Sequence, residues 1–182
     1  RTVSTTRALD KLTAMYNLPL TETPIGFKYI CEKMLDEDIL IGGEESGGIG
    51  VKNHLPERDG VLMGILLLDA MATKGKRLEA LIEDVFALVG QHEYTRTDLH
   101  PPQEKMHLII SALASFKETE FAGGSLEKIT RKDGTRLDFN DGAWLLLRPS
   151  GTEPVVRVYA EATTQERARE LVDKGVALVQ GI

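Results

Sequence analysis

The chain has 182 residues, of which 42% are hydrophobic and 27% charged, and these ordinary globular values exclude a collagen-like or disordered protein. Its 22 Lys and Arg against 28 Asp and Glu give a net charge of −6, which disfavours a nucleic-acid partner. The single cysteine, Cys31, excludes an internal disulfide and fits a reducing compartment, so we expect a cytoplasmic protein.

The first half of the chain predicts helices that alternate with short apolar strands. The segment 61–72 is expected to be a buried helix and not a membrane span, because it is shorter than the ~20 apolar residues that a span needs and Asp69 interrupts it. The apolar run Ile39–Ile41 predicts a buried strand. This alternation is typical of an α/β layered domain with a mainly parallel sheet. Amphipathic helices are expected over residues 8–16, 27–35 and 78–86.

After Gly90 the pattern changes to a series of short strands. A helix is expected in which Met106, Ile109, Ile110 and Leu113 face inward. The pair Asp133-Gly134 is typical of a hairpin turn, and residues 163–166 form a capping box before a last helix. Strands are predicted near residues 93–97, 125–131, 136–139, 143–147 and 155–162. We therefore expect two domains, an α/β domain at residues 1–90 and an α+β domain with an antiparallel sheet flanked by helices at residues 91–182.

The segment at residues 148–154, Arg-Pro-Ser-Gly-Thr-Glu-Pro, joins two predicted strands and has the residue types that bind phosphate. Arg148 can supply a bidentate guanidinium, and Ser150 and Thr152 can supply hydroxyl donors. Gly151 allows a close approach of the backbone to an oxyanion. Arg157 on the following strand could add a second positive charge. The alternative interpretation is a turn with a solvated arginine.

A second loop, at residues 42–48, follows the apolar run and contains four glycines. Ligands of open α/β sheets bind at the carboxyl ends of strands, where this loop is expected. Glu44, Glu45 and Ser46 offer groups that suit the hydroxyls of a polyol better than a phosphate. The glycine spacing does not fit a nucleotide-binding motif. Together the two loops predict a sugar-phosphate site in which they converge on one groove, although a flexible acidic loop is the alternative for residues 42–48.

Both loops resemble motifs of the α-D-phosphohexomutases, the phosphoglucomutase/phosphomannomutase family. Residues 43–48, Gly-Glu-Glu-Ser-Gly-Gly, resemble the sugar-binding loop of that family, and residues 148–154 resemble its phosphate-binding loop. Gly26-Phe27-Lys28 resembles the segment that brings a lysine to the substrate. The resemblance covers essentially the whole chain and implies most of domain 3 followed by domain 4 of a four-domain enzyme.

The resemblance assigns roles to eight residues. Glu44, Ser46 and Lys28 match positions that contact the sugar. Arg148, Ser150, Gly151 and Thr152 match the cradle of the phosphate that is not transferred, with Arg157 as a further candidate. The catalytic serine and the Asp-Gly-Asp-x-Asp-Arg metal loop of the family do not occur in this chain, so no catalytic or metal-binding residue is assigned, and the four histidines lack metal-ligand spacing.

The family resemblance also implies a reaction, the interconversion of a hexose 1-phosphate and a hexose 6-phosphate. It implies a phosphoserine, Mg²⁺ and a hexose 1,6-bisphosphate intermediate, with serine and metal supplied by preceding domains of the same polypeptide. We expect glucose phosphate as the substrate, mannose phosphate as the alternative, and no activity from this chain alone. A non-catalytic sugar-phosphate-binding module and a purely structural domain pair are the other hypotheses, and a serine loop and a metal loop upstream would favour the mutase.

Overall fold

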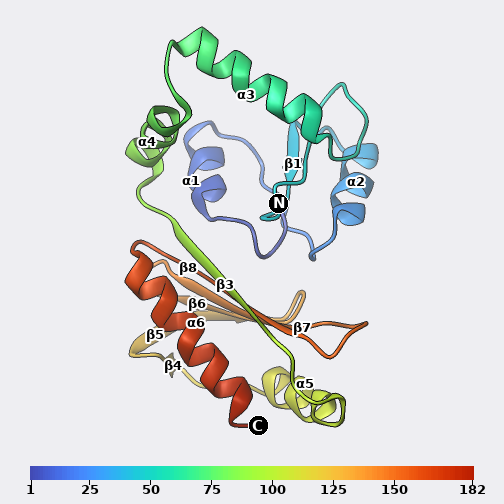
Figure 1. Cartoon of the computed structure of the whole chain (residues 1–182), viewed down its shortest axis with the longest axis vertical. Helices are drawn as coiled ribbons and strands as arrows, with labels where there is room; N and C mark the ends of the chain where they lie inside the picture. Colours follow the sequence, from blue (N-terminus) through green and yellow to red (C-terminus); the bar gives the residue numbers. More distant parts are fainter. The chain divides into compact units, whose positions relative to one another are not determined.

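A computed structural model describes every residue of the chain, Arg1–Ile182. The chain divides into two compact units, Arg1–Gly90 and Gln91–Ile182 (Figure 1). None of the helices is both long enough and apolar enough to pass through a lipid bilayer. The two units are described one after the other.

The first unit consists of four helices and two short strands. The side chain of Asp59 accepts a hydrogen bond from the amide of Leu62 at 2.9 Å, and this cap fixes the start of the third helix. Gly75 ends that helix in the left-handed conformation. The elements are α1 (Ala8–Met15), α2 (Phe27–Asp36), β1 (Ile41–Gly43), β2 (Ile49–Val51), α3 (Gly60–Lys74) and α4 (Leu78–Val89).

The strands of the first unit pair differently from the expected mainly parallel sheet. Strands β1 and β2 form an antiparallel pair, in which Gly42 lies opposite Gly50. Parallel pairing in this unit is limited to one isolated bridge, between Thr2 and Thr23. The loop between β1 and β2 has only five residues, which permits a hairpin but not the crossover that a parallel pair requires.

Two predictions about burial in this unit are wrong. Helix α3 forms where a buried helix was expected, but it contains no buried residue, and Val61 is 76% exposed. The apolar run Ile39–Ile41 becomes a strand only at its last residue, and Leu40 is 61% exposed. An apolar sequence shows that burying a segment would be energetically favourable. Burial also requires another surface to pack against, and this chain leaves the side chains of Val61 and Leu40 exposed.

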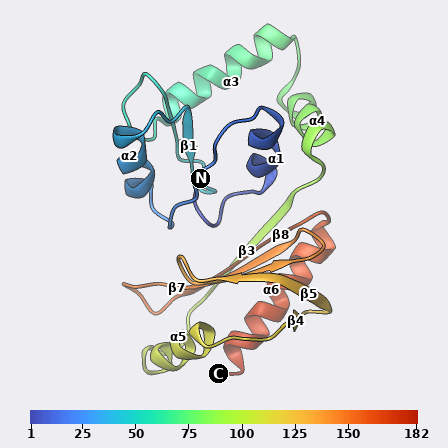
Figure 2. The same cartoon turned by 180° about the vertical axis from the view of Figure 1, so that it is seen from behind.

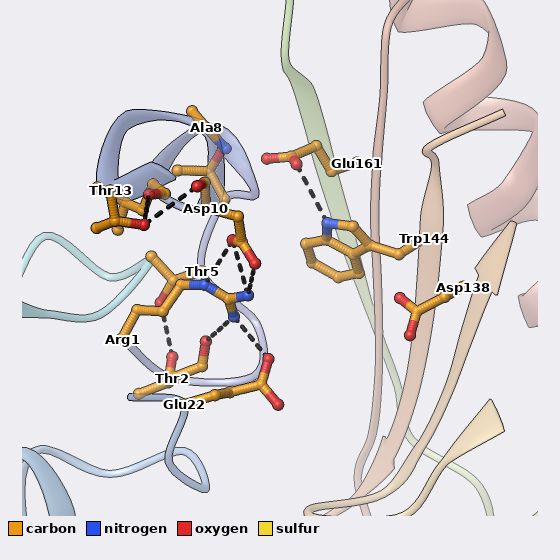
Figure 3. A network of polar contacts seen from close by, with 12 residues as sticks. Arg1, Thr2, Thr5, Ala8, Asp10, Thr13, Glu22, Asp138, Trp144 and Glu161 are labelled. Atoms are coloured by element: carbon orange, nitrogen blue, oxygen red, sulfur yellow. Dashed lines mark hydrogen bonds and ion pairs between the residues drawn. The ribbon is translucent and has the colours of Figure 1, made fainter. Parts of the chain in front are cut away.

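A network of charged side chains around Arg1 anchors the N-terminal segment of the first unit (Figure 3). The guanidinium of Arg1 donates to both carboxylate oxygens of Asp10, at 3.0 and 2.8 Å, and to Glu22 at 2.7 Å. Burial by itself would lower the pKa of Arg1, but the hydrogen bonds and charges of Asp10 and Glu22 raise it overall. The network links the start of α1 to the strand-like segment before α2.

The second unit contains a six-stranded antiparallel sheet with the strand order β3-β8-β7-β6-β5-β4. The predicted hairpin at Asp133-Gly134 connects β5 and β6, and Thr164 caps the last helix by accepting a hydrogen bond from the amide of Arg167 at 3.2 Å. The hairpin and the start of the last helix are confirmed, but the cap is Thr164 with Arg167 at the third helical position, so the capping box predicted at residues 163–166 does not form. The elements are β3 (Glu93–Leu99), the 3-10 turn η1 (Gln103–Lys105), α5 (Met106–Ala114), β4 (Glu120–Phe121), β5 (Gly124–Thr130), β6 (Thr135–Phe139), β7 (Trp144–Pro149), β8 (Val156–Ala162) and α6 (Gln165–Gln180).

Helices α5 and α6 cover the same face of this sheet and enclose the core of the second unit (Figure 2). Alternate residues of β8, from Val156 to Ala162, point into that core, as their spacing predicted. Ile110 of α5 was expected to face inward but is 47% exposed, because Met106, Ile109 and Leu113 occupy the inner face of this short helix. The α/β followed by α+β fold class is confirmed at this level.

Candidate functional site

The glycine-rich loop connects β1 to β2 as a tight turn. The amide of Glu44 donates to the carbonyl of Gly48 at 2.9 Å, and the amide of Gly47 donates to the carbonyl of Glu44 at 3.1 Å. Gly47 has φ +87°, a conformation that favours glycine. Two glycines of the flanking strands are required by packing. A Cβ on Gly42 of β1 would lie 2.4 Å from Cγ2 of Ile30, and a Cβ on Gly50 of β2 would crowd Phe27 and Met34.

The carboxylate of Glu44 connects this loop to the start of α2. Its Oε1 accepts a hydrogen bond from the amide of Gly26 at 3.0 Å, and its Oε2 lies 3.6 Å from Nη1 of Arg58. The side chain is only 6% exposed. A carboxylate offers about four lone-pair sites, so acceptor capacity remains for hydroxyl groups after these two contacts.

The other predicted residues of this loop region are placed at the surface. Ser46 and Lys28 are exposed, and Nζ of Lys28 lies 4.7 Å from the ring centre of Tyr29. The bond between Gly26 and Glu44 brings the Lys28 segment and the loop to one side of the unit. Sequence reasoning missed Arg58, and the sequence held no signal that distinguished it from Lys52, the other cation that follows the loop. It also missed Ser4, whose hydroxyl donates to Glu45 at 2.7 Å.

The second predicted loop connects β7 to β8 at the end of a strand pair. Its base is closed by the amide of Ser150, which donates to the carbonyl of Val155 at 2.7 Å. The amide of Thr152 lies 3.4 Å from Oγ of Ser150, and the two hydroxyl oxygens are 3.5 Å apart. A Cβ on Gly151 would meet nothing within 4 Å, so no contact inside the chain explains the glycine. The loop thus presents two hydroxyls and an open stretch of backbone side by side.

Arg148 stands at the start of this loop and is held by a carboxylate. Its Nε donates at 2.9 Å to Oδ1 of Asp133, a residue of the β5–β6 hairpin turn. The terminal amino groups of Arg148 make no hydrogen bond in the structure. They therefore remain as a pair of donors, the arrangement that grips phosphate oxygens.

Arg157 lies directly opposite Arg148 in the pairing of β7 with β8. Its Nε is 3.7 Å from Oδ2 of Asp98, and its Nη2 is 3.9 Å from Oε2 of Glu153 in the loop itself. Asp98 also accepts two hydrogen bonds from Arg96, at 2.7 and 2.6 Å, and these hold the pKa of its carboxyl below the usual value. The structure thus places two arginines side by side at the base of the loop, each beside a carboxylate.

A cavity of about 300 Å³ adjoins the loop within the second unit. Its walls are the exposed side of α5 around Ile110, the turn at Gly134 and Thr135, and the backbone of Pro149–Gly151. The surface is mainly apolar, so we do not assign it to the anionic group, which would lie at the arginine side of the loop.

The donor set of this chain does not fit a magnesium site. No three His, Cys, Asp or Glu side chains lie together in a group that could hold a metal ion. Mg²⁺ prefers near-octahedral oxygen coordination with carboxylates, which scattered acidic side chains do not supply. We therefore assign no residue of this chain to a metal.

Comparison with family models matches both units. Residues 1–89 match the model for "Phosphoglucomutase/phosphomannomutase, alpha/beta/alpha domain III". Residues 101–178 match the model for "Phosphoglucomutase/phosphomannomutase, C-terminal domain". Nearly the whole chain is thus accounted for by two consecutive domains of one family.

Individual relatives agree with these matches. A phosphoglucomutase/phosphomannomutase of Thermococcus kodakarensis is 29% identical over 98% of this chain and 37% of its own length. A phosphoglucosamine mutase of Methanococcus aeolicus is 33% identical over 98% of this chain and 38% of its own length. The crystal structure of a candidate phosphomannomutase from Thermus thermophilus superimposes with a TM-score of 0.79 and 36% identity, over 99% of this chain and 36% of that one. The chain spans a little over one third of the length of these relatives, and it belongs to the phosphoglucomutase/phosphomannomutase family, the α-D-phosphohexomutases.

Proposed function

We propose that this chain supplies two substrate-binding loops of a phosphohexomutase that interconverts a hexose 1-phosphate and a hexose 6-phosphate. In this proposal residues 1–90 bind sugar hydroxyls and residues 91–182 bind the phosphate that is not being transferred. The transferred phosphoryl group is carried by a phosphoserine outside this chain, with Mg²⁺ bound there and a hexose 1,6-bisphosphate as the intermediate. Positioning of this kind contributes much of the rate of a phosphoryl transfer, although none of these residues touches the reacting atom.

The observation that carries the proposal is the arrangement of the β7–β8 loop. Arg148 offers unoccupied terminal amino groups, and Ser150 and Thr152 present their hydroxyls beside an open backbone at Gly151. Arg157 adds a second positive charge on the neighbouring strand. These are the donors that a phosphate monoester requires, gathered on one turn between two paired strands.

The β1–β2 loop supports the sugar-binding half of the proposal. Glu44 retains acceptor capacity beside the Gly26 amide, and Ser46 and Lys28 are accessible to a ligand. Vicinal hydroxyls donate to carboxylates, and a hexose has such hydroxyls in similar places whichever of its ends faces the reaction. We propose that these three side chains hold the ring in both orientations.

Glucose phosphate is our proposed substrate, and mannose phosphate is the alternative. The loop sequence Glu-Glu-Ser-Gly favours these two over amino sugars, whereas several relatives are phosphoglucosamine mutases. Assays of the longer polypeptide on glucose, mannose and glucosamine phosphates would rank the three. Equal or faster turnover of glucosamine phosphate would overturn the preference.

The phosphate-binding role can be tested on the 182-residue chain by titration with glucose 1-phosphate, followed by amide NMR. We expect shifts at Ser150–Thr152, and we expect Arg148→Ala to weaken binding roughly 10- to 100-fold, because hydrogen bonds between charged partners contribute about 1.5–3 kcal/mol each. An unchanged affinity in Arg148→Ala would remove the proposed role.

A non-catalytic sugar-phosphate-binding module would pass the same titration. The longer polypeptide separates the two hypotheses, because a mutase converts glucose 1-phosphate to glucose 6-phosphate and a binding module does not. For the 182-residue chain alone we expect binding without turnover.

A further inference from the structure

We propose that Asp133 is a positioning residue that aims the guanidinium of Arg148 at the anion, an inference that rests on the proposed phosphate-binding role of the β7–β8 loop. The two side chains meet through a hydrogen bond in which Nε of Arg148 donates to Oδ1 of Asp133 at 2.9 Å. They are 19% and 21% exposed, so both are largely shielded by the surrounding chain.

Asp133 binds Nε of Arg148 and not a terminal amino group, and this determines which donors of the guanidinium stay available to a ligand. A carboxylate that binds Nε sets the plane of the guanidinium but leaves both terminal amino groups available. Phosphate oxygens bind best to two parallel N–H groups held in one plane. A free arginine would lose rotamer freedom when it bound an anion, and Asp133 removes part of that loss before the ligand arrives.

Asp133 is itself held in place by the backbone. It precedes Gly134 in the β5–β6 turn, and Gly134 has φ +87°. A Cβ on Gly134 would lie 2.6 Å from the carbonyl oxygen of Leu147 and 2.9 Å from Cα of Arg148. The turn is therefore pressed against the backbone of Arg148, and only a glycine permits this approach, which fixes the distance between the two side chains.

Asp133 affects phosphate binding in two opposite ways, through its negative charge and through its hydrogen bond to Nε of Arg148. A carboxylate near a bound phosphate repels it, whereas the hydrogen bond to Nε favours binding by orienting the arginine. Two substitutions separate the effects. Asp133→Asn keeps an oxygen acceptor and removes the charge, and Asp133→Ala removes both. If Asp133 acted only through its charge, both variants would bind phosphate more tightly.

The experiment titrates the 182-residue chain and its variants with inorganic phosphate and with glucose 1-phosphate, and follows the Nε–H signal of Arg148 and the loop amides by NMR. We expect Asp133→Ala to raise the dissociation constant roughly 3- to 10-fold, in line with the usual cost of ordering one long side chain on binding. We expect Asp133→Asn to bind as tightly as the parent chain or more tightly, with the Nε–H signal retained.

Asp141→Ala is the matched control, because Asp141 lies in another turn of the same sheet and pairs with Arg167 at 3.3 Å. This variant should leave phosphate binding unchanged. Unchanged or tighter binding in Asp133→Ala overturns the positioning role, even if Arg148→Ala abolishes binding. Unchanged binding in Arg148→Ala would instead remove the phosphate-binding function itself. Melting temperatures close to that of the parent chain show that the variants are folded.

Discussion

The substitution Gly134→Ala tests how closely the β5–β6 turn is packed against the candidate phosphate loop. Gly134 has φ +87°, which costs an L-residue about 1–2 kcal/mol. Its new Cβ would also lie 2.6 Å from a backbone oxygen and 2.9 Å from a backbone carbon, neither of which can rotate away, and overpacking of this kind costs about 1–3 kcal/mol. The lower entropy of the unfolded alanine chain offsets about 0.4–1 kcal/mol. We therefore expect a loss of roughly 3 kcal/mol in the free energy of unfolding.

Urea unfolding followed by tryptophan fluorescence measures this loss, because Trp144 is the only tryptophan and is fully buried at the start of β7, in the unit that the substitution destabilises. Gly142→Ala is the control. Gly142 has φ +84° but nothing within 4 Å of its Cβ position, so it should show the conformational cost without the clash. We expect the two variants to differ by about 1–3 kcal/mol, the contribution of overpacking. Equal losses would refute the close approach of the turn to Arg148.

Three further predictions concern a helix cap, a carboxylate and the candidate loop. Thr164→Ala should destabilise the second unit by about 1 kcal/mol, because it removes the N-cap of α6, while Thr164→Ser should retain most of the stability in the same urea assay. The hydrogen bond from Arg96 lowers the pKa of Asp98, so its stabilising effect should be complete above the usual value of 3.8 and should be lost as the pH falls through the lower folded-state pKa. A carboxyl NMR titration of Asp98 with a midpoint at or above 3.8 would contradict this. Gly151→Ala should leave the stability within about 0.5 kcal/mol, since its Cβ meets nothing, yet weaken glucose 1-phosphate binding; an unchanged affinity would show that no ligand approaches that backbone.

Local signals in the sequence predicted the local structure of the second unit well. The Asp133-Gly134 turn, the start of the last helix and the inward face of β8 all depend on residues close together in the chain, and each is confirmed, although the helix is capped by Thr164, one residue later than the predicted capping box requires. The contact between Asp133 and Arg148 was not predicted. It joins residues 15 positions apart, and its existence depends on the register of β6 against β7, which a loop motif does not encode.

The first unit shows where pattern reasoning fails. The four glycines of residues 42–48 predicted a ligand loop, and this role stays a prediction, but the structure adds that Gly42 is required by the packing of the hairpin against Ile30. Composition cannot distinguish a glycine that admits a ligand from one that admits a neighbouring side chain. The apolar sequence of α3 likewise predicted burial, but none of its residues is buried and only some are partly covered in this chain.

The two candidate loops are supported by different kinds of structure, each within its own unit. The candidate phosphate loop joins two strands whose buried residues belong to one continuous core with α5 and α6, so the positions of Arg148 and Arg157 are set by a packed sheet. A site built on such strands keeps its geometry without help from a ligand. The β1–β2 loop stands on a two-stranded hairpin, which is marginal by itself and depends on contacts such as that of Gly42 with Ile30. On this chain, a titration with inorganic phosphate thus reports on geometry that the second unit supplies alone, whereas binding of a neutral hexose would test the less supported of the two loops.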